Sequence, residues 1–278
     1  MKGRPLKGRP NLAAYDVILC NISGGKDSQA MLDETVKAAD AAGVRDRIVA
    51  VFCDLGEDDE WEGTRELVAE HAAHYGLRHE VVQREVDGQA ESLSEHIEAR
   101  GMWPDSARRY CTSDMKRAPV HKLMTRLASE QREGQGVRGR RVRILNVMGL
   151  RAEESPKRAL MHPFIRDERA TYQTTRLVNE WLPIHSWTVD QVWERIAECG
   201  TRPHPVYAKG MPRLSCKFCV LASKSALVRA AQLDPQGAQK RADMEIRMGH
   251  TFKKGMSMAQ IIALAAEAES VKVENWAA

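Results

Sequence analysis

Short apolar runs alternate with amphipathic helical patterns over roughly the first two thirds of the chain. Because each run is short, apolar and bounded by polar residues or glycine, we expect buried strands there. The expected strands are 15–22 (YDVILCNI), 48–54 (IVAVFCD), 78–83, 142–148 and a weaker one at 177–184. Helical patterns at about 27–42 and 60–75 separate the first three strands. This alternation predicts an α/β fold, a parallel sheet sandwiched by helices.

Further helices are predicted from their start signals. Capping boxes begin at Ser92, Thr188 and Ser257, and another helical pattern follows Pro119. Residues 201–219 are rich in Pro, Gly and basic side chains, which is typical of a loop. We therefore expect a basic flexible tail at 1–14, an α/β domain at 15–200, and a cysteine-bearing loop with a helical C-terminal extension at 201–278.

Composition and charge narrow the class of protein. Hydrophobic residues make up 43% and charged residues 29% of the 278 residues, which is ordinary for a globular protein. No apolar run approaches the roughly 18 residues of a membrane span, and the basic N-terminus lacks the apolar segment of a secretory signal. Six cysteines without a secretory signal favour a reducing compartment. These features predict a cytoplasmic protein with no membrane partner.

The net charge of +4 is local. Lys2, Arg4, Lys7 and Arg9 supply it, and the remaining chain is neutral. A second basic cluster lies at 138–143, with four arginines after a Gly-rich stretch. Either cluster is explained by solvated charge or by contact with nucleic-acid phosphates.

The string Ser23-Gly24-Gly25-Lys26-Asp27-Ser28 stands between an expected buried strand and a helix start. Backbone N–H groups and the helix dipole can hold an anion at such a place. The glycines permit close approach, Lys26 adds a cation, and the serines offer hydroxyl donors. The loop is too short for a Walker A motif. An ordinary Gly-rich turn is the simpler alternative.

SGGKDS resembles the PP-loop of ATP pyrophosphatases, a superfamily that includes phosphoadenosine-phosphosulfate (PAPS) reductases and thiouridine-forming tRNA enzymes. The string 149–158 (GLRAEESPKR) is similar to the G-x-R-x-x-E-S-x-x-R segment of the PAPS-reductase-like branch. Arg109-Tyr110-Cys111-Thr112, followed by Lys116 and Pro119, is similar to the C-T…K…P segment of that branch. The resemblance implies a Rossmann-type, adenine nucleotide alpha hydrolase-like fold.

The resemblance also implies the site residues, with ATP and Mg²⁺ as cofactors. Catalytic roles are expected for Lys26, Asp27, Arg151 and Arg158. ATP and phosphate contacts are expected from Ser23, Gly24, Gly25, Lys26, Asp27, Ser28, Asp54, Gly149 and Lys157. Ser155-Pro156 is also a plain helix start, which is compatible with phosphate binding nearby.

Cys216 and Cys219 form a lone CxxC, a spacing shared by zinc, iron–sulfur and dithiol redox sites. The resembled branch carries cysteines there and at the position of Cys111. These three could hold a [4Fe–4S] cluster with one iron free, with Cys199 as a possible fourth ligand; catalytic persulfide or disulfide chemistry is the alternative. Cys199 could equally be a packing residue at a helix end.

The chain departs from the assimilatory PAPS reductases in two respects. Their loop lacks the Lys-Asp pair of Lys26-Asp27, and their Glu-Cys-Gly nucleophile lies near the C-terminus, whereas Glu198-Cys199-Gly200 lies mid-chain here. Cleavage of ATP to AMP and pyrophosphate is therefore favoured. The closest resemblance is to the ATP-pyrophosphatase subunit of Dnd- and Ssp-type DNA phosphorothioation systems. It implies a DNA acceptor and a cysteine desulfurase as sulfur donor. Homo-oligomerisation is possible.

The alternatives are a PAPS or APS (sulfonucleotide) reductase, a tRNA sulfurtransferase, and a non-enzymatic nucleotide-binding regulator.

Overall fold

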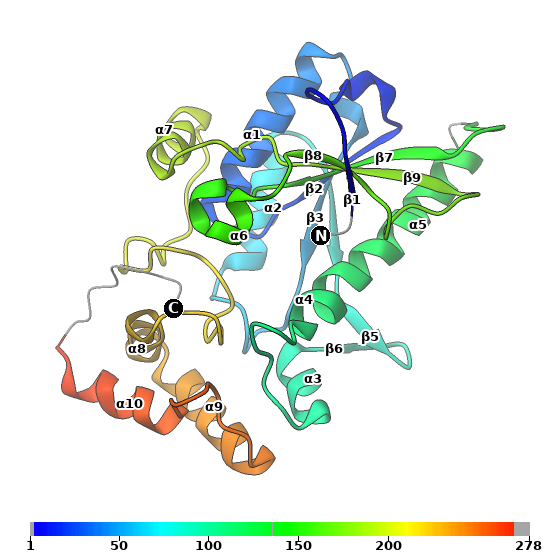
Figure 1. Cartoon of the computed structure of the whole chain (residues 1–278). Helices are drawn as coiled ribbons and strands as arrows, with labels where there is room; N and C mark the ends of the chain where they lie inside the picture. Colours follow the sequence, from blue (N-terminus) through cyan, green and yellow to red (C-terminus); the bar gives the residue numbers. More distant parts are fainter. Residues whose placement is uncertain (1–2, 135, 270–278) are drawn as a thin grey trace. The chain divides into compact units, whose positions relative to one another are not determined.

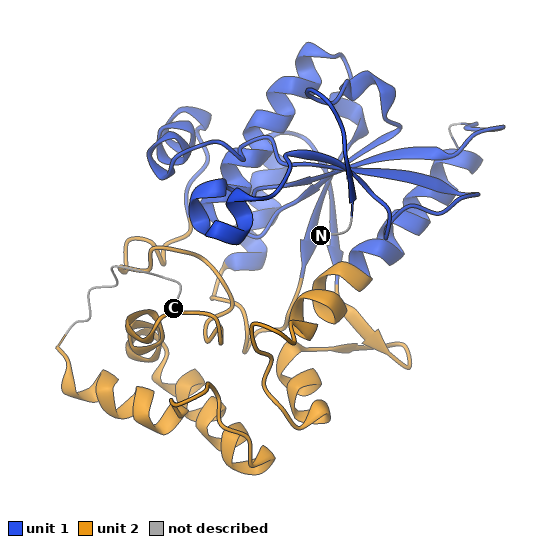
Figure 2. Cartoon of the chain, viewed as in Figure 1, with its two compact units in different colours: residues 1–53, 64–82, 119–203 blue, residues 54–63, 83–118, 204–278 orange. Residues whose placement is uncertain are grey.

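The computed structural model describes residues 3–134 and 136–269 and divides the chain into two compact units (Figure 2). The first unit contains residues 1–53, 64–82 and 119–203, and the second contains 54–63, 83–118 and 204–278. In the described residues, no helix has the length and apolar character needed to cross a membrane.

A seven-stranded sheet in the order β1-β8-β9-β7-β2-β3-β4 forms the centre of the first unit (Figure 1). Its five parallel strands are β2 (Val17–Asn21), β3 (Ile48–Cys53), β4 (Arg78–Val82), β7 (Val142–Met148) and β9 (Arg176–Trp181). These are the five strands expected from the apolar runs. The predicted α/β class, a mostly parallel sheet flanked by helices, is confirmed.

Helices cover both faces of this sheet because its strands alternate their side chains. Ile18 and Cys20 of β2 belong to a core that includes residues of α1 and α7, whereas Val17 and Leu19 belong to a core that includes residues of α5. The helices are α1 (Lys26–Ala41), α2 (Thr64–His74), α5 (Ala118–Glu133), α6 (Pro156–Ala159) and α7 (Val189–Cys199), with 3-10 turns at Leu12–Ala14, Arg45–Arg47 and Ala152–Glu154.

The N-terminal segment differs from the expected flexible tail. Residues Gly3–Pro5 form β1, an edge strand antiparallel to β8 (Phe164–Asp167), which itself runs antiparallel to β9. Proline is tolerated at such an edge. A Cβ on Gly3 would lie 2.6 Å from the carbonyl oxygen of Arg166, so the close pairing requires glycine. Lys2 lies outside the described residues.

The second unit has its own core and is assembled from three separate segments. Leu55, Trp61, Leu93 and Trp103 join that core together with the C-terminal helices. Its elements are a hairpin of β5 (Arg84–Val86) and β6 (Gln89–Glu91), α3 (Leu93–Arg100), α4 (Tyr110–Thr112), a π-helical turn (Ser113–Arg117), α8 (Lys224–Leu233), α9 (Pro235–Met248) and α10 (Met258–Glu267). Residues 54–63 and 83–118 of this unit lie within the range 15–200 that was expected to form the α/β domain.

A buried ion pair joins these segments. The carboxylate of Asp59 lies 2.6 Å from the guanidinium of Arg241, and each residue is 3% exposed. The hydroxyl of Ser94 donates to Asp59 and accepts from Arg241. Burial raises the pKa of Asp59, although Arg241 and Ser94 oppose that shift. Removing one partner would leave an unpaired buried charge, which is strongly destabilising.

Burial in the core predicts where a truncation destabilises the fold. Leu19 is fully buried in β2, so Leu19→Ala should lower the free energy of unfolding by about 2–5 kcal/mol. Leu160→Ala, at an 89% exposed side chain, is the control and should change it by less than about 0.5 kcal/mol. Urea denaturation followed by circular dichroism measures both. Equal effects of the two substitutions would contradict the assigned burial.

Candidate functional site

Residues 23–28, which we call the phosphate loop, connect β2 to α1. They leave the start of α1 without a side-chain cap. Gly24 adopts a φ of 71°, in the left-handed region that favours glycine. Gly25 is the N-cap residue, and no side-chain hydrogen bond caps the helix there. The N–H groups of the first turn are therefore available to an anion, which the helix dipole also favours.

The two loop serines fix the shape of this turn. The hydroxyl of Ser28 donates to the carbonyl oxygen of Gly25 at 2.8 Å and accepts from the backbone N–H of Ser23 at 3.1 Å. The two serine hydroxyls lie 3.2 Å apart. Ser28 thus has a structural role in the loop, whether or not it also contacts phosphate.

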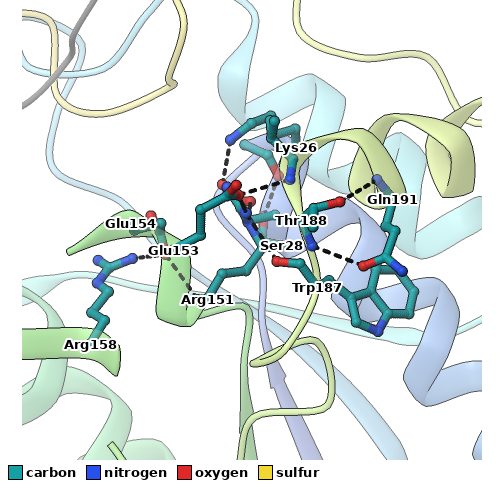
Figure 3. A network of polar contacts seen from close by, with 12 residues as sticks. Lys26, Ser28, Arg151, Glu153, Glu154, Arg158, Trp187, Thr188 and Gln191 are labelled. Atoms are coloured by element: carbon teal, nitrogen blue, oxygen red, sulfur yellow. Dashed lines mark hydrogen bonds and ion pairs between the residues drawn. The ribbon is translucent and has the colours of Figure 1, made fainter. Parts of the chain in front are cut away.

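Two cations meet at the first turn of α1 through one carboxylate (Figure 3). The carboxylate oxygens of Asp27 lie 2.7 Å from Lys26 Nζ and 2.6 Å from Arg151 Nε. Lys26 and Arg151 are each 4% exposed. Burial opposes ionisation of Asp27, but the two cations outweigh it and lower the pKa of this carboxyl. Residues that follow two different strands are thereby held together at the first turn of α1.

Gly149 makes the contact between Arg151 and Asp27 possible. It directly follows β7, which pairs with β2 in parallel. A Cβ at Gly149 would lie 2.5 Å from the carbonyl oxygen of Asp27 and 3.0 Å from the backbone nitrogen of Ser28. Only glycine permits the backbone after β7 to approach the first turn of α1 so closely.

Two glutamates of the 149–158 string hold its two arginines in place. Glu153 pairs with Arg151, whose guanidinium also donates to the carbonyl oxygen of Trp187 at 3.1 Å. Glu154 pairs with Arg158 and accepts from the backbone N–H of Arg151 at 3.0 Å. Figure 3 shows these contacts as one network. Lys157, by contrast, is exposed on the short α6.

The two glutamates were not among the predicted site residues, although they stand in the string that carried the resemblance. Asp54, which was predicted, directly follows β3 and belongs to the second unit. Its carboxylate is buried and accepts a hydrogen bond of 2.9 Å from the backbone N–H of Gly56.

The second unit gathers three cysteines that lie far apart in sequence. Cys111 is on α4, while Cys216 and Cys219 lie in the loop before α8, and all three pack against the core of this unit. All are free thiols. A hydrogen bond from Cys216 and another from the backbone of Leu221 lower the pKa of Cys219 to about 7, although burial opposes the shift. The same hydrogen bond raises the pKa of Cys216.

Two further charged residues act on these thiols and were not predicted as site residues. Lys116, on the π-helical turn, favours the thiolate form of all three: it opposes the rise in the pKa of Cys111 and Cys216 and adds to the lowering of the pKa of Cys219. Glu60 lies among the same groups, and burial raises its pKa to about 8. Lys116 is the lysine of the C-T…K…P segment, so that motif contained a signal for it. Nothing in the sequence singled out Glu60.

The predicted metal ligands comprise three thiols in the second unit and one in the first. Three neighbouring thiols suit an iron–sulfur cluster chemically, yet no group of three His, Cys, Asp or Glu side chains in the described part of the chain already converges as a metal site. Cys199 belongs to the first unit, at the end of α7, where its sulfur lies 2.9 Å from the hydroxyl of Thr201. Gly200 ends that helix with a φ of 72°, as expected for a helix terminus rather than a C-terminal nucleophile.

A family model for the phosphoadenosine phosphosulfate reductase domain matches residues 17–222. The chain belongs to the PAPS reductase domain family. The matched range contains the phosphate loop, the 149–158 string and the three cysteines of the second unit.

Two curated proteins are similar to this family member in sequence. One, an uncharacterized 37.8 kDa protein of Escherichia phage 186, is 25% identical over 57% of the chain and 43% of its own length. The other, an uncharacterized protein of Methanocaldococcus jannaschii, is 24% identical over 83% of the chain and 48% of its own length. The alignments thus span less than half the length of either relative.

Solved structures resemble the PAPS reductase domain protein at low identity. PAPS reductase from Candida auris has a TM-score of 0.46 and 16% identity, covering 74% of this chain and 83% of that one. The U34-tRNA thiolase NcsA from Methanococcus maripaludis, which holds a [4Fe-4S] cluster, has a TM-score of 0.41 and 13% identity, covering 94% of this chain and 74% of that one.

The contact at Gly149 predicts a loss of nucleotide binding. In Gly149→Ala the new methyl group meets the first turn of α1, so the phosphate loop must shift. We expect ATP affinity to fall about 10-fold or more, a change of about 1.4 kcal/mol. Isothermal titration calorimetry measures it. Gly134→Ala, whose Cβ would come no closer than 3.2 Å to the carbonyl oxygen of Glu130, is the matched control. Undiminished affinity in Gly149→Ala would contradict the assigned approach.

The pKa shifts in the cysteine cluster predict how alkylation of each thiol depends on pH. The thiolate is the reactive form, and a lowered pKa makes it available at lower pH. In iron-free protein, alkylation of Cys219 by iodoacetamide should therefore rise through pH about 7. Alkylation of Cys111, whose pKa burial raises, should rise only at higher pH. Peptide mass spectrometry separates the sites.

The matched variant for this experiment is Cys216→Ala. It removes the hydrogen bond that favours the Cys219 thiolate, so the inflection for Cys219 should move upward. A Cys219 inflection that does not move in Cys216→Ala, or one that already lies at or above that of Cys111 in the wild-type protein, would show that this hydrogen bond does not govern its reactivity.

Proposed function

We propose that this member of the PAPS reductase domain family is an ATP pyrophosphatase that adenylates an acceptor for sulfur incorporation, with the DNA backbone as the acceptor. The observation that carries the proposal is the meeting of Lys26 and Arg151 at the uncapped start of α1. An acceptor oxygen attacks the α-phosphorus of ATP, the bond to the β-phosphate breaks, and pyrophosphate leaves.

The charges in the first unit suit that step. A leaving pyrophosphate gains negative charge, which fixed cations and N–H groups stabilise without reorganising. Lys26 and Arg151 are held by Asp27 before any ligand arrives. Asp27 also offers the hard oxygen ligands that Mg²⁺ prefers, so the ion that enters with ATP can engage the carboxylate while the two cations turn to phosphate. Arg158 and Lys157 supply further positive charge on the same string.

We assign the thiols of the second unit to the second step of the reaction, in which sulfur is incorporated into the adenylated acceptor. A thiol reductant would release sulfide from the persulfide of a cysteine desulfurase partner; this sulfide would attack the adenylated phosphorus, forming a P–S bond while the P–O bond to the departing AMP breaks. Cys111, Cys216 and Cys219 are proposed either as ligands of a [4Fe–4S] cluster or as thiols that carry sulfur themselves. A cluster with only three cysteine ligands would keep one iron open to exogenous sulfide.

One observation favours a second candidate, a sulfonucleotide reductase. Cys219 shares a hydrogen bond with Cys216 and has a lowered pKa, as a dithiol redox pair would require. Such an enzyme would consume PAPS with a thiol donor and would not release pyrophosphate from ATP.

Pyrophosphate release from Mg·ATP tests the first candidate. We expect Lys26→Ala and Asp27→Ala to lower turnover by about 100-fold or more, the usual magnitude for losing an electrostatic contact to the transition state. Lys37→Ala is the matched control, because this lysine lies on the same helix, is exposed, and pairs with Asp33 at 2.9 Å away from the phosphate loop. Unchanged turnover in Lys26→Ala would refute the role of the loop, and PAPS reduction in place of pyrophosphate release would favour the reductase.

A further inference from the structure

A basic cavity of about 410 Å³ lies in the second unit, outside the residues assigned so far. Four arginines line it together with backbone and side-chain atoms of the segment around α4. The lining residues are Arg100, Met102, Ala107, Arg108, Arg109, Tyr110, Ser113 and Arg117. Residues 100–117 contain five basic and two acidic side chains, so the cavity carries excess positive charge.

Two of the four arginines are fixed by partners. Arg100 lies 3.4 Å from the carboxylate of Asp114 and 4.4 Å above the centre of the Tyr110 ring. Arg108 pairs with Asp105 at 3.0 Å. These contacts hold the side chains of Arg100 and Arg108 in position along the lining of the cavity.

The other two arginines have no such partner. Neither Arg109 nor Arg117 has an acidic group of the described residues within 4.0 Å, and both side chains are exposed. Guanidinium groups match phosphate oxygens in a planar, two-pronged fashion. A wall with two uncommitted guanidinium groups is therefore suited to a ligand with more than one phosphate.

The position of the cavity connects it to the thiols. The segment 109–117 provides Arg109 and Arg117 to the cavity, and it also provides Cys111 and Lys116 to the cysteine cluster. Its π-helical turn, Ser113–Arg117, is a wider turn of the kind that is frequent at functional sites. One short segment thus serves both the cavity and the sulfur-bearing side chains.

We propose that this cavity binds the sugar–phosphate backbone of the DNA acceptor, an inference that rests on the proposed function. It would bring the acceptor beside Cys111, where the sulfur chemistry is assigned. A strand with regularly spaced phosphates fits two separate uncommitted arginines better than a single phosphate group does.

The arginine-rich loop before β7 is the competing surface. It lines a cavity of about 540 Å³ in the first unit, with Arg132, Arg138, Arg140 and Arg141. Arg140 is committed to Asp16 at 2.7 Å, and Arg132 donates to the carbonyl oxygen of Thr174. Because this loop precedes β7 whereas the phosphate loop follows the parallel strand β2, the two lie at opposite ends of the sheet. It is therefore a poor place for an acceptor that must meet ATP, and it supplies a matched control.

The test compares two double variants by fluorescence anisotropy with a labelled DNA duplex over a range of salt concentrations. We expect Arg109→Ala/Arg117→Ala to weaken binding about 10-fold or more and to reduce the slope of log affinity against log salt by about 2, as loss of two phosphate contacts requires. Arg109→Lys/Arg117→Lys keeps the charge and should retain most of the slope. Arg138→Ala/Arg141→Ala should leave affinity and slope unchanged.

Several outcomes would overturn the cavity proposal. An unchanged slope in Arg109→Ala/Arg117→Ala would do so, as would an equal loss in Arg138→Ala/Arg141→Ala. Arginine-dependent binding of PAPS or of an RNA duplex in preference to DNA would also do so. Circular dichroism of each variant separates loss of binding from loss of folding.

Pyrophosphate release by the wild-type protein, measured in parallel, separates this proposal from the proposed function. If the wild type releases pyrophosphate but its DNA affinity does not depend on Arg109 and Arg117, only the cavity proposal fails. If it releases none while those arginines govern DNA affinity, only the proposed function fails.

Discussion

One carboxylate organises the phosphate site. Asp27 lies on the first turn of α1 and holds Lys26 and Arg151, which come from different strand ends, at ion-pair distance. The arrangement depends on Gly149, because any side chain there would meet the backbone of Asp27. Two buried cations without this carboxylate would repel each other at a helix end that is itself positive. Asp27 thus holds both cations, charged and in place, at the start of α1.

The chain places the phosphate loop and the three neighbouring thiols in two units with separate cores. The first is a parallel sheet whose strand ends present the phosphate loop and the 149–158 string. The second is held by the buried pair of Asp59 and Arg241 and contains the thiols. The backbone of Asp59 also accepts a hydrogen bond of 2.9 Å from Lys217, between Cys216 and Cys219. Asp59 therefore contacts Arg241 through its side chain and the CxxC loop through its backbone.

The sequence predicted the elements whose signal is local. The parallel strands were predictable because each is a continuous apolar run, and α3, α7 and α10 because their capping boxes are explicit. The edge strands β1 and β8 were missed, since they are short, contain charged residues or proline, and depend on partners distant in sequence. The second unit was missed as a unit for the same reason. From the sequence alone, Leu55 and Trp61 were expected in the α/β domain, because only their packing shows that they belong to the core of the second unit.

The site residues show the same difference between those with a local sequence signal and those that depend on contacts between distant residues. The phosphate-loop residues, Gly149 and Arg151 were predictable from contiguous motifs, and the structure brings them together. Glu153 and Glu154 were not predicted as partners of the arginines, because an ion pair depends on side-chain geometry. The role of Glu60 depends on burial beside thiols that are distant in sequence. The composition of the arginine-rich loop at 138–143 made it a candidate for nucleic-acid contact. Its position before β7, however, places it at the opposite end of the sheet from the phosphate loop.

The most direct test of the central claim is the position at which ATP is cleaved. Purified protein would be incubated with Mg²⁺ and ATP labelled in the γ-phosphate, and the products separated by chromatography. Cleavage between the α- and β-phosphates predicts label in pyrophosphate together with AMP in equal amount. Label in orthophosphate together with ADP would contradict the account, because it would show that the phosphate loop directs attack to the terminal phosphate.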